Sequence, residues 1–569
     1  MSLIDRRDFR IALLTGLVAF LVYNANLRLV AAGDTLPARF LPLAVWKDGS
    51  VYLDNMRHVA LQKHQRPYWV LYAPNGHWAS MYPVVTPLLV SPIYAPGVIY
   101  LHRHGWSYDN MSRVGALLEK LSSSTVAATA VGLMFLVLRR RVGRRDALLL
   151  TAVFAFATGT WSTSSQALWQ HGPAELFLVV ALWCLTGEPT RGNLLIAGFA
   201  AGLLVANRPP DVLLAAGLSL YALVWARWRA ALFALAAAVP VALFLFYNLT
   251  TFHRLAGGYA AAGVGTRFFG GSILEGIAGL LFSPAVGLFV FCPFFLFLPF
   301  LFHRSLREER YRILTLCLAG AVVCQILLYA RTDWRAGFSY GPRFLVDAVP
   351  ILVWMLAPVL ASLGRGARIA FAACGLFAAG VQYVGAFHYT GISSLLYHTE
   401  RSQVWNPAKA SFLIEARTPR QPAVLLRTFQ SLSHPVPMVE PMPVLTSVGN
   451  HSSAGPLDFY TVQPCRAFDS RPNAKIVAGE QRTISFQGCG VPDHAGSVAV
   501  NFTTADATDF GHLRMLPESS ATVPFAAGQT RAYGAILPLD RGSLGVRIVM
   551  PDDGRVHLIV DVVGYFAQR

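Results

Sequence analysis

Apolar stretches close to the length that crosses a bilayer, about 20 residues, recur between residues 11 and 391 and are absent beyond residue 391. This pattern constrains the fold most strongly, because stretches of this length are buried in lipid or against one another. Charged residues make up only 14% of the chain, against about 25% in soluble domains. The sequence therefore predicts an α-helical polytopic membrane protein with a water-soluble C-terminal region.

We expect eleven membrane-spanning segments. Their predicted bounds are 11–31, 115–138, 146–164, 172–187, 194–207, 211–226, 230–248, 284–302, 313–330, 344–363 and 369–391. Residues 83–101 contain four prolines, which disfavour a continuous spanning helix. This stretch is predicted to be a re-entrant or interfacial element within a long first outer loop, residues 32–112.

Arginines collect in alternate connections between the predicted spans. Basic residues beside a membrane segment are retained in the cytoplasm, which predicts a multi-pass protein of the plasma (inner) membrane with a cytoplasmic N-terminus and an extracytoplasmic C-terminal region. The net charge of +17 is therefore attributed to topology, and nucleic acid is not an expected partner. The arginines concerned are Arg6, Arg7, Arg10, Arg139, Arg140, Arg141, Arg144, Arg145, Arg227, Arg229, Arg304, Arg307, Arg310, Arg312, Arg365 and Arg368.

The C-terminal region is rich in Pro, Ser, Thr and Gly. Residues 392–444 are predicted to be a linker, and residues 445–569 a small β-sandwich or barrel. Short segments that alternate apolar and polar residues predict half-buried strands; they are 497–504, 512–517, 545–550 and 556–566.

Cys465 and Cys489 are the two cysteines of this region, whereas the other five lie in apolar spans. An isolated pair in an extracytoplasmic domain is a disulfide candidate. The motifs PCRAFDSR at 464–471, CGVP at 489–492 and the closing DVVGYF resemble a module that recurs in bacterial surface and secreted proteins. Binding of glycan or cell-wall material and a passive structural role both remain open for it.

Polar and ionisable residues inside apolar helices are costly and tend to line a cavity or a pathway. By the predicted topology these residues collect at the outer face, and we expect them to meet in one hollow there. They are Asp34, His171, Glu175, Arg208, Asp211, Arg335, Tyr340, Arg343 and Asp347.

Asp34 follows the first apolar stretch directly. One interpretation is a helix cap at the start of a loop helix. The other is a general base, because partial burial raises the pKa of a carboxylate that then accepts a proton from a hydroxyl. Asp54 is a second carboxylate of the same loop and is interpreted as a solvated loop residue.

His171 and Glu175 are four residues apart and share one helix face. Two ligands are too few for a metal, so a hydrogen-bonded pair is favoured. Arg208 lies in the NRPPD turn, either at the level of the lipid headgroups or as a phosphate contact.

The stretch 333–350 combines Arg335, Tyr340 and Arg343 before an apolar helix. An arginine fork matches two phosphate oxygens, the free amides at a helix start favour anions, and Tyr340 is predicted to hydrogen-bond the same group. The alternative is an arginine paired with Asp347 one helical turn later.

Four motifs, GDTLPARFLP, LWQHGPAELF, NRPPD and FSYGPRFLVDAVP, occur in an order that resembles the GT-C superfamily of polytopic glycosyltransferases. They are most similar to a bacterial branch related to protein O-mannosyltransferases and aminoarabinose transferases. The resemblance covers about residues 11–391. It implies inverting transfer of a sugar from a polyprenyl-phosphate donor to an acceptor outside the cytoplasm.

On this chain the resemblance implies that Asp34 is the catalytic base and that Arg343, with Arg208 and Arg335, holds the donor phosphate. It also implies that residues 83–101 border the groove for the carrier lipid. Related enzymes often have two neighbouring carboxylates in the first outer loop, whereas Thr35 follows Asp34 here. A divalent cation therefore remains an open question, and no cofactor is required by the sequence.

The implied partners are the lipid-linked donor, membrane lipids, and an acceptor that is a lipid, a glycan or a protein. A transporter or flippase for a lipid-linked or anionic substrate is the main alternative, and it predicts internal repeats and helices broken near the membrane midplane. A membrane-anchored adhesin or scaffold would need a single span. The glycosyltransferase hypothesis requires Asp34 and Arg343 to lie together on one side of the membrane.

Overall fold

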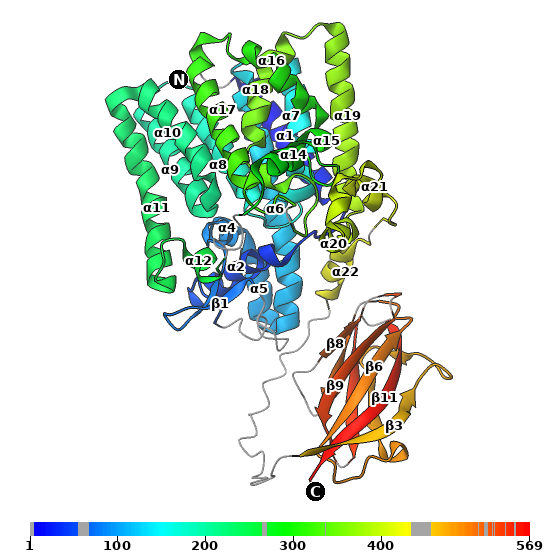
Figure 1. The fold of residues 1–569 in the computed structure, drawn as a ribbon. Coiled ribbons are helices and arrows are strands. Elements are labelled where there is room, and N and C mark those ends of the chain that lie inside the picture. Colours follow the sequence, from blue (N-terminus) through cyan, green and yellow to red (C-terminus); the bar gives the residue numbers. More distant parts are fainter. Residues whose placement is uncertain are drawn as a thin grey trace. The chain divides into compact units, whose positions relative to one another are not determined.

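The structure is a computed structural model that describes residues 5–54, 68–263, 270–335, 337–420, 422–433, 457–509, 511–516, 522–525, 527–528, 530–540, 542–550 and 554–568. The chain divides into two units, a helical unit containing most of residues 1–438 and a β-unit containing residues 439–569. Figure 1 shows the two architectures, helices in the first and strands in the second. The protein is thus an α-helical membrane protein with a C-terminal all-β domain.

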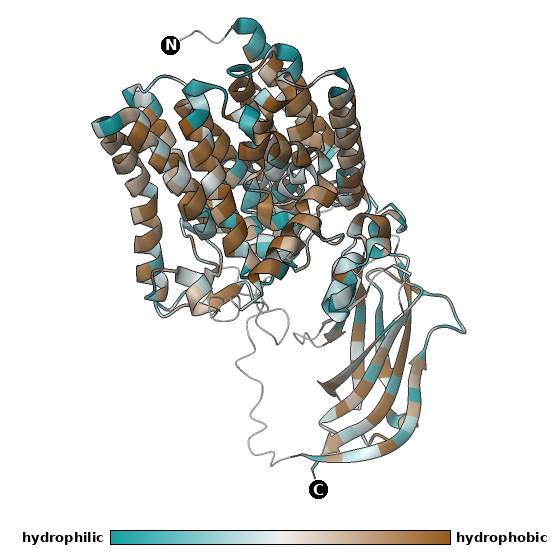
Figure 2. Ribbon diagram, turned by 45° about the horizontal axis from the view of Figure 1, so that its top comes forward, coloured by the Kyte–Doolittle hydropathy of each residue, from teal (hydrophilic) through white to brown (hydrophobic). Residues whose placement is uncertain are grey.

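The helices of the first unit follow the apolar pattern of the sequence. The bundle contains α1 (Arg6–Asn24), α6 (Tyr108–Arg139), α7 (Arg144–Phe156), η4 (Thr160–Ser164), α8 (His171–Leu185), α9 (Arg191–Asn207), η5 (Pro209–Asp211), α10 (Val212–Ala226), η6 (Arg227–Arg229), α11 (Ala230–Phe252), α14 (Ile273–Phe282), α15 (Leu288–Phe291), η7 (Pro293–Leu296), α16 (Phe297–Ser305), α17 (Glu309–Ala330), η8 (Arg343–Leu345), α18 (Val349–Ala361) and α19 (Arg365–Phe387). Most of their residues are hydrophobic, as the brown ribbons of Figure 2 show.

Within the described residues, five helical segments are long and apolar enough to cross a membrane. They are Val85–His104, Tyr108–Arg139, Pro209–Ala261, Glu309–Ala330 and Arg365–Phe387. Each predicted span except 284–302 corresponds to one main helix. That span is divided into α15, η7 and α16 because Pro293 forces the residue before it, Cys292, out of the helical conformation, to φ −133° and ψ 66°.

The first outer loop forms a layer of its own. It contains η1 (Gly33–Thr35), α2 (Leu36–Asp48), the hairpin β1 (Val70–Tyr72) and β2 (Trp78–Ser80), α4 (Val85–Val90), η3 (Ser91–Tyr94) and α5 (Ala95–His104). Figure 1 shows α2, α4, α5 and β1 at the end of the bundle opposite the N-terminus.

The proline-rich stretch remains helical throughout, as α4, η3 and α5 in succession. Its prolines change the type of helix without ending the helical path, so the predicted interruption is weaker than expected. Val90, Tyr94, Val98 and Leu101 of this stretch share a buried cluster with α2 and the first half of α6.

The arginine-rich connections meet at the other end of the bundle. Salt bridges join Arg139 and Arg144 to Asp8, Arg141 to Glu308, Arg310 to Glu188, and Arg368 to Asp146. The ends of α6, α8 and α18 and the starts of α1, α7, α9, α17 and α19 therefore share one face, as the topology prediction requires.

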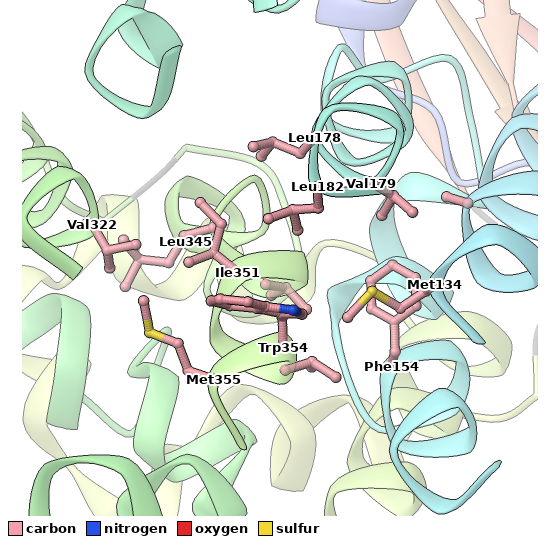
Figure 3. Close-up of a cluster of buried hydrophobic side chains, with 14 of the residues drawn as sticks. Met134, Phe154, Leu178, Val179, Leu182, Val322, Leu345, Ile351, Trp354 and Met355 are labelled. Carbon is pink, nitrogen blue, oxygen red and sulfur yellow. The ribbon is translucent and has the colours of Figure 1, made fainter. Parts of the chain in front are cut away.

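The core of the bundle is apolar and closely packed. Figure 3 shows Trp354 and Ile351 of α18 beside Phe154 of α7, Met134 of α6 and Leu182 of α8, and all five are buried. Small residues allow the helices to approach: a Cβ on Gly198 of α9 would lie 2.1 Å from the carbonyl oxygen of Phe233 on α11.

Residues after α19 were predicted to begin a linker, but the structure places 392–433 in the helical unit. They form α20 (Ile392–Thr399), η9 (Arg401–Trp405), η10 (Pro407–Lys409), α21 (Ser411–Ala416) and α22 (Val424–Ser431). The buried carboxylate of Glu415 accepts hydrogen bonds from Thr390 and Ser393, and the amide of Leu425 donates to the carbonyl of Leu27. These bonds attach the segment to the bundle. Residues 434–444 of the predicted linker lie outside the described residues.

The β-unit contains two sheets. One has the strand order β5-β10-β7-β8, and the other has the order β3-β11-β6-β9 with β4 paired to β11. Their inner faces share one buried apolar cluster, so the unit is a β-sandwich. A disulfide links Cys465 and Cys489, whose Cα atoms lie 5.5 Å apart. The strands are β3 (Asp458–Asp469), β4 (Ile476–Val477), β5 (Gln481–Ser485), β6 (Ser497–Ala505), β7 (Gly511–Leu516), β8 (Thr522–Phe525), β9 (Arg531–Pro538), β10 (Ser543–Val549) and β11 (Arg555–Ala567).

Candidate active site

Charged side chains from distant stretches of the chain meet at the end of the bundle opposite the arginine-rich connections. Asp34 follows α1, His171 begins α8, Arg208 follows α9, and Arg343 precedes α18. The other ends of these four helices lie at the arginine-rich face. These four residues, which were predicted to collect on one side of the membrane, therefore lie at the same end of the bundle.

Asp34 is the centre of the first group. Its Oδ2 accepts a hydrogen bond from Nη1 of Arg343 at 2.9 Å, and its Oδ1 accepts from the hydroxyls of Tyr68 at 2.6 Å and Tyr82 at 2.7 Å. The side chain of Asp34 is 28% exposed and that of Arg343 is 13% exposed. The carboxylate is thus the more accessible member of this ion pair.

The helix-cap interpretation of Asp34 does not describe these contacts. Thr35 holds the position before α2 and makes no side-chain capping bond. The Asp34 carboxylate is directed toward the guanidinium and the two phenols.

The pKa of Asp34 was expected to be raised, and this expectation is wrong. Burial alone would raise it, but the charge of Arg343 and the hydrogen bonds from Tyr68, Tyr82 and Arg343 together hold the pKa of the carboxyl below its ordinary value. Asp34 is therefore ionised at neutral pH, which a proton acceptor requires.

Tyr68 and Tyr82 were not identified from the sequence. Tyr68 lies two residues before Val70 and Tyr82 two residues after Ser80, and Val70 pairs with Ser80 at the open end of the hairpin. The two chain segments that leave the hairpin therefore both bring a phenol to the same carboxylate. Tyr68 reaches Asp34 across Gly33, where a Cβ would lie 2.3 Å from the phenol oxygen. The glycine before Asp34 is the only local signal in the sequence for this approach.

A second, more deeply buried group surrounds Asp347. His171 Nδ1 lies 2.7 Å from Asp347 Oδ1, and Arg208 Nε lies 2.7 Å from Asp347 Oδ2. Arg208 also donates to the hydroxyl of Tyr329 at 2.7 Å. The ion pair to Asp347 orients Arg208 at the end of α9. The sequence allowed, as an alternative, an arginine of the stretch 333–350 paired with Asp347. The arginine that pairs with Asp347 is Arg208, whereas Arg343 pairs with Asp34.

The predicted hydrogen bond between His171 and Glu175 is wrong. Thr160 of η4 donates to Glu175 at 2.8 Å, and His171 contacts Asp347 instead. The two side chains share a helix, but each meets a different neighbouring element. Glu175 is fully buried and lies beneath the site.

Arg335 and Tyr340 do not join the Asp34 group. Arg335 contacts Asp333 at 2.9 Å and Glu275 of α14 at 3.4 Å. The buried Tyr340 donates to the carbonyl of Val381 at 2.7 Å. Both side chains contact other partners in this structure, and their roles as substrate contacts stay predictions. Asp54 pairs with His77 at 2.7 Å in the outer hairpin and is 39% exposed, as expected for a loop carboxylate.

The segment between η4 and α8 forms the floor beneath Arg343. The guanidinium lies over the ring of Trp169, 5.0 Å from its centroid. Glu119 of α6 accepts from the amide of Leu168 at 3.2 Å, and the buried Lys120 donates to Gln166 at 2.7 Å. Both charges lie within a predicted apolar span and were not identified as part of the site.

A divalent cation does not fit the residues present. Among the residues that the structure describes, no group of three or more His, Cys, Asp or Glu side chains could hold a metal ion. The neighbours of Asp34 are a guanidinium and two phenols, all hydrogen-bond donors, whereas a divalent cation gathers several oxygen acceptors.

An apolar groove with a volume of about 730 Å³ lies among α6, α8, α9 and α11. Its lining residues are Thr129, Leu133, Leu176, Phe177, Val180, Leu195, Ile196, Phe199, Ala200, Leu203, Ala236 and Val239. Leu203 is four residues from Asn207, the last residue of α9, or about 6 Å along the helix axis. Along α9 the groove extends from Leu195 to Leu203, between the arginine-rich end of the helix and the end at Asn207. Residues 83–101, which were expected to border a lipid groove, are not among those that line it.

The chain is similar to known proteins only at the level of solved structures among the comparisons made. No family model matches the chain, and no curated protein matches it. The solved structure of ArnT from Cupriavidus metallidurans in the apo state is similar at 15% identity and a TM-score of 0.38, over 74% of this chain and 75% of that one.

Two structures from Archaeoglobus fulgidus are also similar. The oligosaccharyltransferase AglB with an inhibitory peptide and dolichol-phosphate has 12% identity and a TM-score of 0.35 over 72% of this chain. The apo oligosaccharyltransferase has 11% identity and a TM-score of 0.37, also over 72% of this chain. The present chain spans 56% of the length of both.

Proposed function

We propose that this protein is an integral membrane glycosyltransferase that moves a sugar from a polyprenyl-phosphate donor to a hydroxyl acceptor on the extracytoplasmic side. The observation that carries the proposal is the 2.9 Å contact between Asp34 and Arg343. The proposal is supported by this pairing of a carboxylate, which can accept a proton, with a guanidinium, which can bind an anion, at one end of the bundle. Residues far apart in sequence supply the two halves of a group-transfer site.

The reaction is a single inverting displacement. The acceptor hydroxyl gives its proton to Asp34 and its oxygen forms a bond to the anomeric carbon of the sugar. The bond from that carbon to the phosphate oxygen breaks, and its electron pair leaves with the lipid phosphate. Arg343, together with Arg208, stabilises the negative charge that grows on the leaving group.

Donor binding also prepares the base. Arg343 contacts Asp34 in the present structure, and a phosphate is a strong competing partner for its guanidinium. When Arg343 turns to the phosphate, Asp34 loses the cation that lowers its pKa and becomes more basic. Proton transfer is thereby coupled to the presence of the donor.

The apolar groove suits the carrier lipid. Its lining is almost wholly aliphatic and aromatic, and an isoprenoid chain is stabilised there by burial of apolar surface. A chain in the groove would carry its phosphate toward the end of α9, where Arg208 lies.

A transporter or flippase is the competing hypothesis. Polar groups that carry a substrate across the membrane are expected near the midplane. Here Asp34, His171, Arg208 and Arg343 lie at helix ends, beyond α1, at the first residue of α8, after α9 and before α18. This placement favours chemistry at one surface.

Radiolabelled sugar transfer from polyprenyl-phosphate donors in purified membranes tests the proposal. We expect Asp34→Asn to fold and to lose transfer, because the amide cannot accept the proton. Asp54→Asn is the matched control, since it removes a carboxylate of the same loop outside the site, and it should retain activity. Equal rates for wild type and Asp34→Asn would refute the assigned role.

A further inference from the structure

Tyr259 contacts a neighbour of each charged group, because its hydroxyl bonds Gln170, the residue before His171, and its ring meets Tyr82, which bonds Asp34. It belongs to α12 (Gly257–Ala261), and its ring meets the edge of Tyr82 at a centroid distance of 5.7 Å. Gln170 in turn bonds the backbone carbonyl of Asn207, the residue before Arg208. A residue of a separate outer segment thus borders both charged groups.

We propose that Tyr259 is a further donor-contact residue, whose hydroxyl donates a hydrogen bond to a phosphate oxygen of the lipid-linked donor. This inference rests on the proposed function and deepens it. The ligand chemistry is a phosphate ester held by two guanidinium groups and one phenol.

The present hydrogen bond of Tyr259 is readily exchanged. Its hydroxyl donates to Oε1 of Gln170, a neutral amide oxygen, at 3.1 Å. A phosphate oxygen is a stronger acceptor because it carries negative charge. Gln170 and Asn207 exchange two further hydrogen bonds of 2.8 Å, so Gln170 stays in place when the phenol changes partner.

The backbone of α12 fixes where the phenol lies. Gly257 has φ +57°, and a Cβ there would lie 2.2 Å from Oδ1 of Asn248. A Cβ on Gly258 would lie 2.4 Å from the carbonyl oxygen of Met81. Two successive glycines therefore seat α12 closely against α11 and the outer hairpin, and a hydroxyl held on such a support is positioned before the substrate arrives.

A purely structural role is the competing explanation. In that case Tyr259 only joins α12 to the start of α8 through Gln170. Gln170→Met, which also removes the side-chain bond to Asn207, would then cost at least as much as Tyr259→Phe. A donor contact predicts different consequences for the two partners, because the phosphate contacts Tyr259 and not Gln170.

The test measures binding of a polyprenyl phosphate without sugar, and transfer from the intact donor, with the purified full-length protein. We expect Tyr259→Phe to weaken binding of the polyprenyl phosphate and to lower kcat/KM by about 10- to 100-fold, the loss of one hydrogen bond to a charged group. Gln170→Met should stay within about threefold of wild type. Tyr247→Phe is the matched control, since Tyr247 lies on α11 and contacts Tyr52 and Phe252.

Thermal unfolding of each variant shows that it is folded. Unchanged binding and kcat/KM in Tyr259→Phe would overturn the inference, as would equal losses in Tyr259→Phe and Gln170→Met. If the wild type neither binds polyprenyl phosphate nor transfers sugar from the intact donor, the proposed function itself fails. If the wild type is active, Asp34→Asn is inactive and Tyr259→Phe is normal, only the role of Tyr259 fails.

Discussion

Replacing Arg343 by Gln tests the central ion pair, because Arg343 acts both on the leaving phosphate and on the base. Its side chain is 13% exposed, so water replaces the lost charge poorly. Removing one preorganised donor from a developing anion costs about 10²- to 10³-fold in turnover, and we expect a loss in kcat of this size. Arg343→Lys keeps the charge without the planar fork, so its loss should be smaller.

The pH profile separates the two tasks of Arg343. Asp34 accepts a proton only when ionised, so activity falls as the pH drops through its pKa. In the wild type the cation and the donated hydrogen bonds hold that pKa below its ordinary value, against burial, which raises it. In Arg343→Gln, Asp34 is still buried, but the positive charge that most strongly lowers its pKa has been removed. The pKa of Asp34 therefore rises, and the acidic limb of kcat/KM moves to higher pH.

The assay is transfer of radiolabelled sugar from the polyprenyl-phosphate donor over a pH series, for wild type and Arg343→Gln. Arg335→Gln is the control, because that guanidinium pairs with Asp333 and Glu275, and its profile should match the wild type. An acidic limb at the same pH in Arg343→Gln would show that the ion pair does not tune Asp34. Unchanged turnover would remove Arg343 from the site.

Three further substitutions test the framework. Replacing Cys465 and Cys489, which lie 24 residues apart in sequence, should destabilise the β-unit by about 3 kcal/mol, measured as earlier thermal unfolding of the full chain under non-reducing conditions. Asp347→Asn removes the charge that pairs with Arg208 at 2.7 Å and should cost about 3–5 kcal/mol in detergent unfolding. Gly198→Val places side-chain atoms against α11 and should cost at least 1–3 kcal/mol by the same measurement; wild-type stability would contradict the helix contact.

The helical bundle was predictable because length and apolar composition alone specify a spanning helix. The break within 284–302 was missed, although Pro293 marks it. The packing of 392–433 on the bundle was missed for a different reason. Its attachment depends on single bonds to distant residues, such as Glu415 to Ser393, and composition does not reveal such bonds.

The meeting of Asp34 with Arg343 was predictable from the order of the spans, since each follows or precedes a helix at the same face. The residues around them were not. Tyr68 and Tyr82 reach Asp34 through the register of a hairpin. Arg335 lies only eight residues before Arg343, yet it contacts α14. Gly337 and Gly341, with φ +63° and +68°, redirect the chain between them, so proximity in sequence is a poor guide to which arginine joins the site.

The buried charges of α6 explain how separate segments are held at the precision that the proposed chemistry requires. A charge within a spanning helix is costly and persists where it has partners and a role. Glu119 joins Arg39 of α2 at 2.5 Å and the amide of Leu168 at 3.2 Å, so one carboxylate connects the helix that follows Asp34 to the segment beneath Arg343. Lys120 and Asn26 both donate to Oε1 of Gln166 at 2.7 Å. Because the segments next to Asp34 and beneath Arg343 both bond to neighbouring residues of α6, this helix positions the carboxylate and the guanidinium side by side before the donor binds.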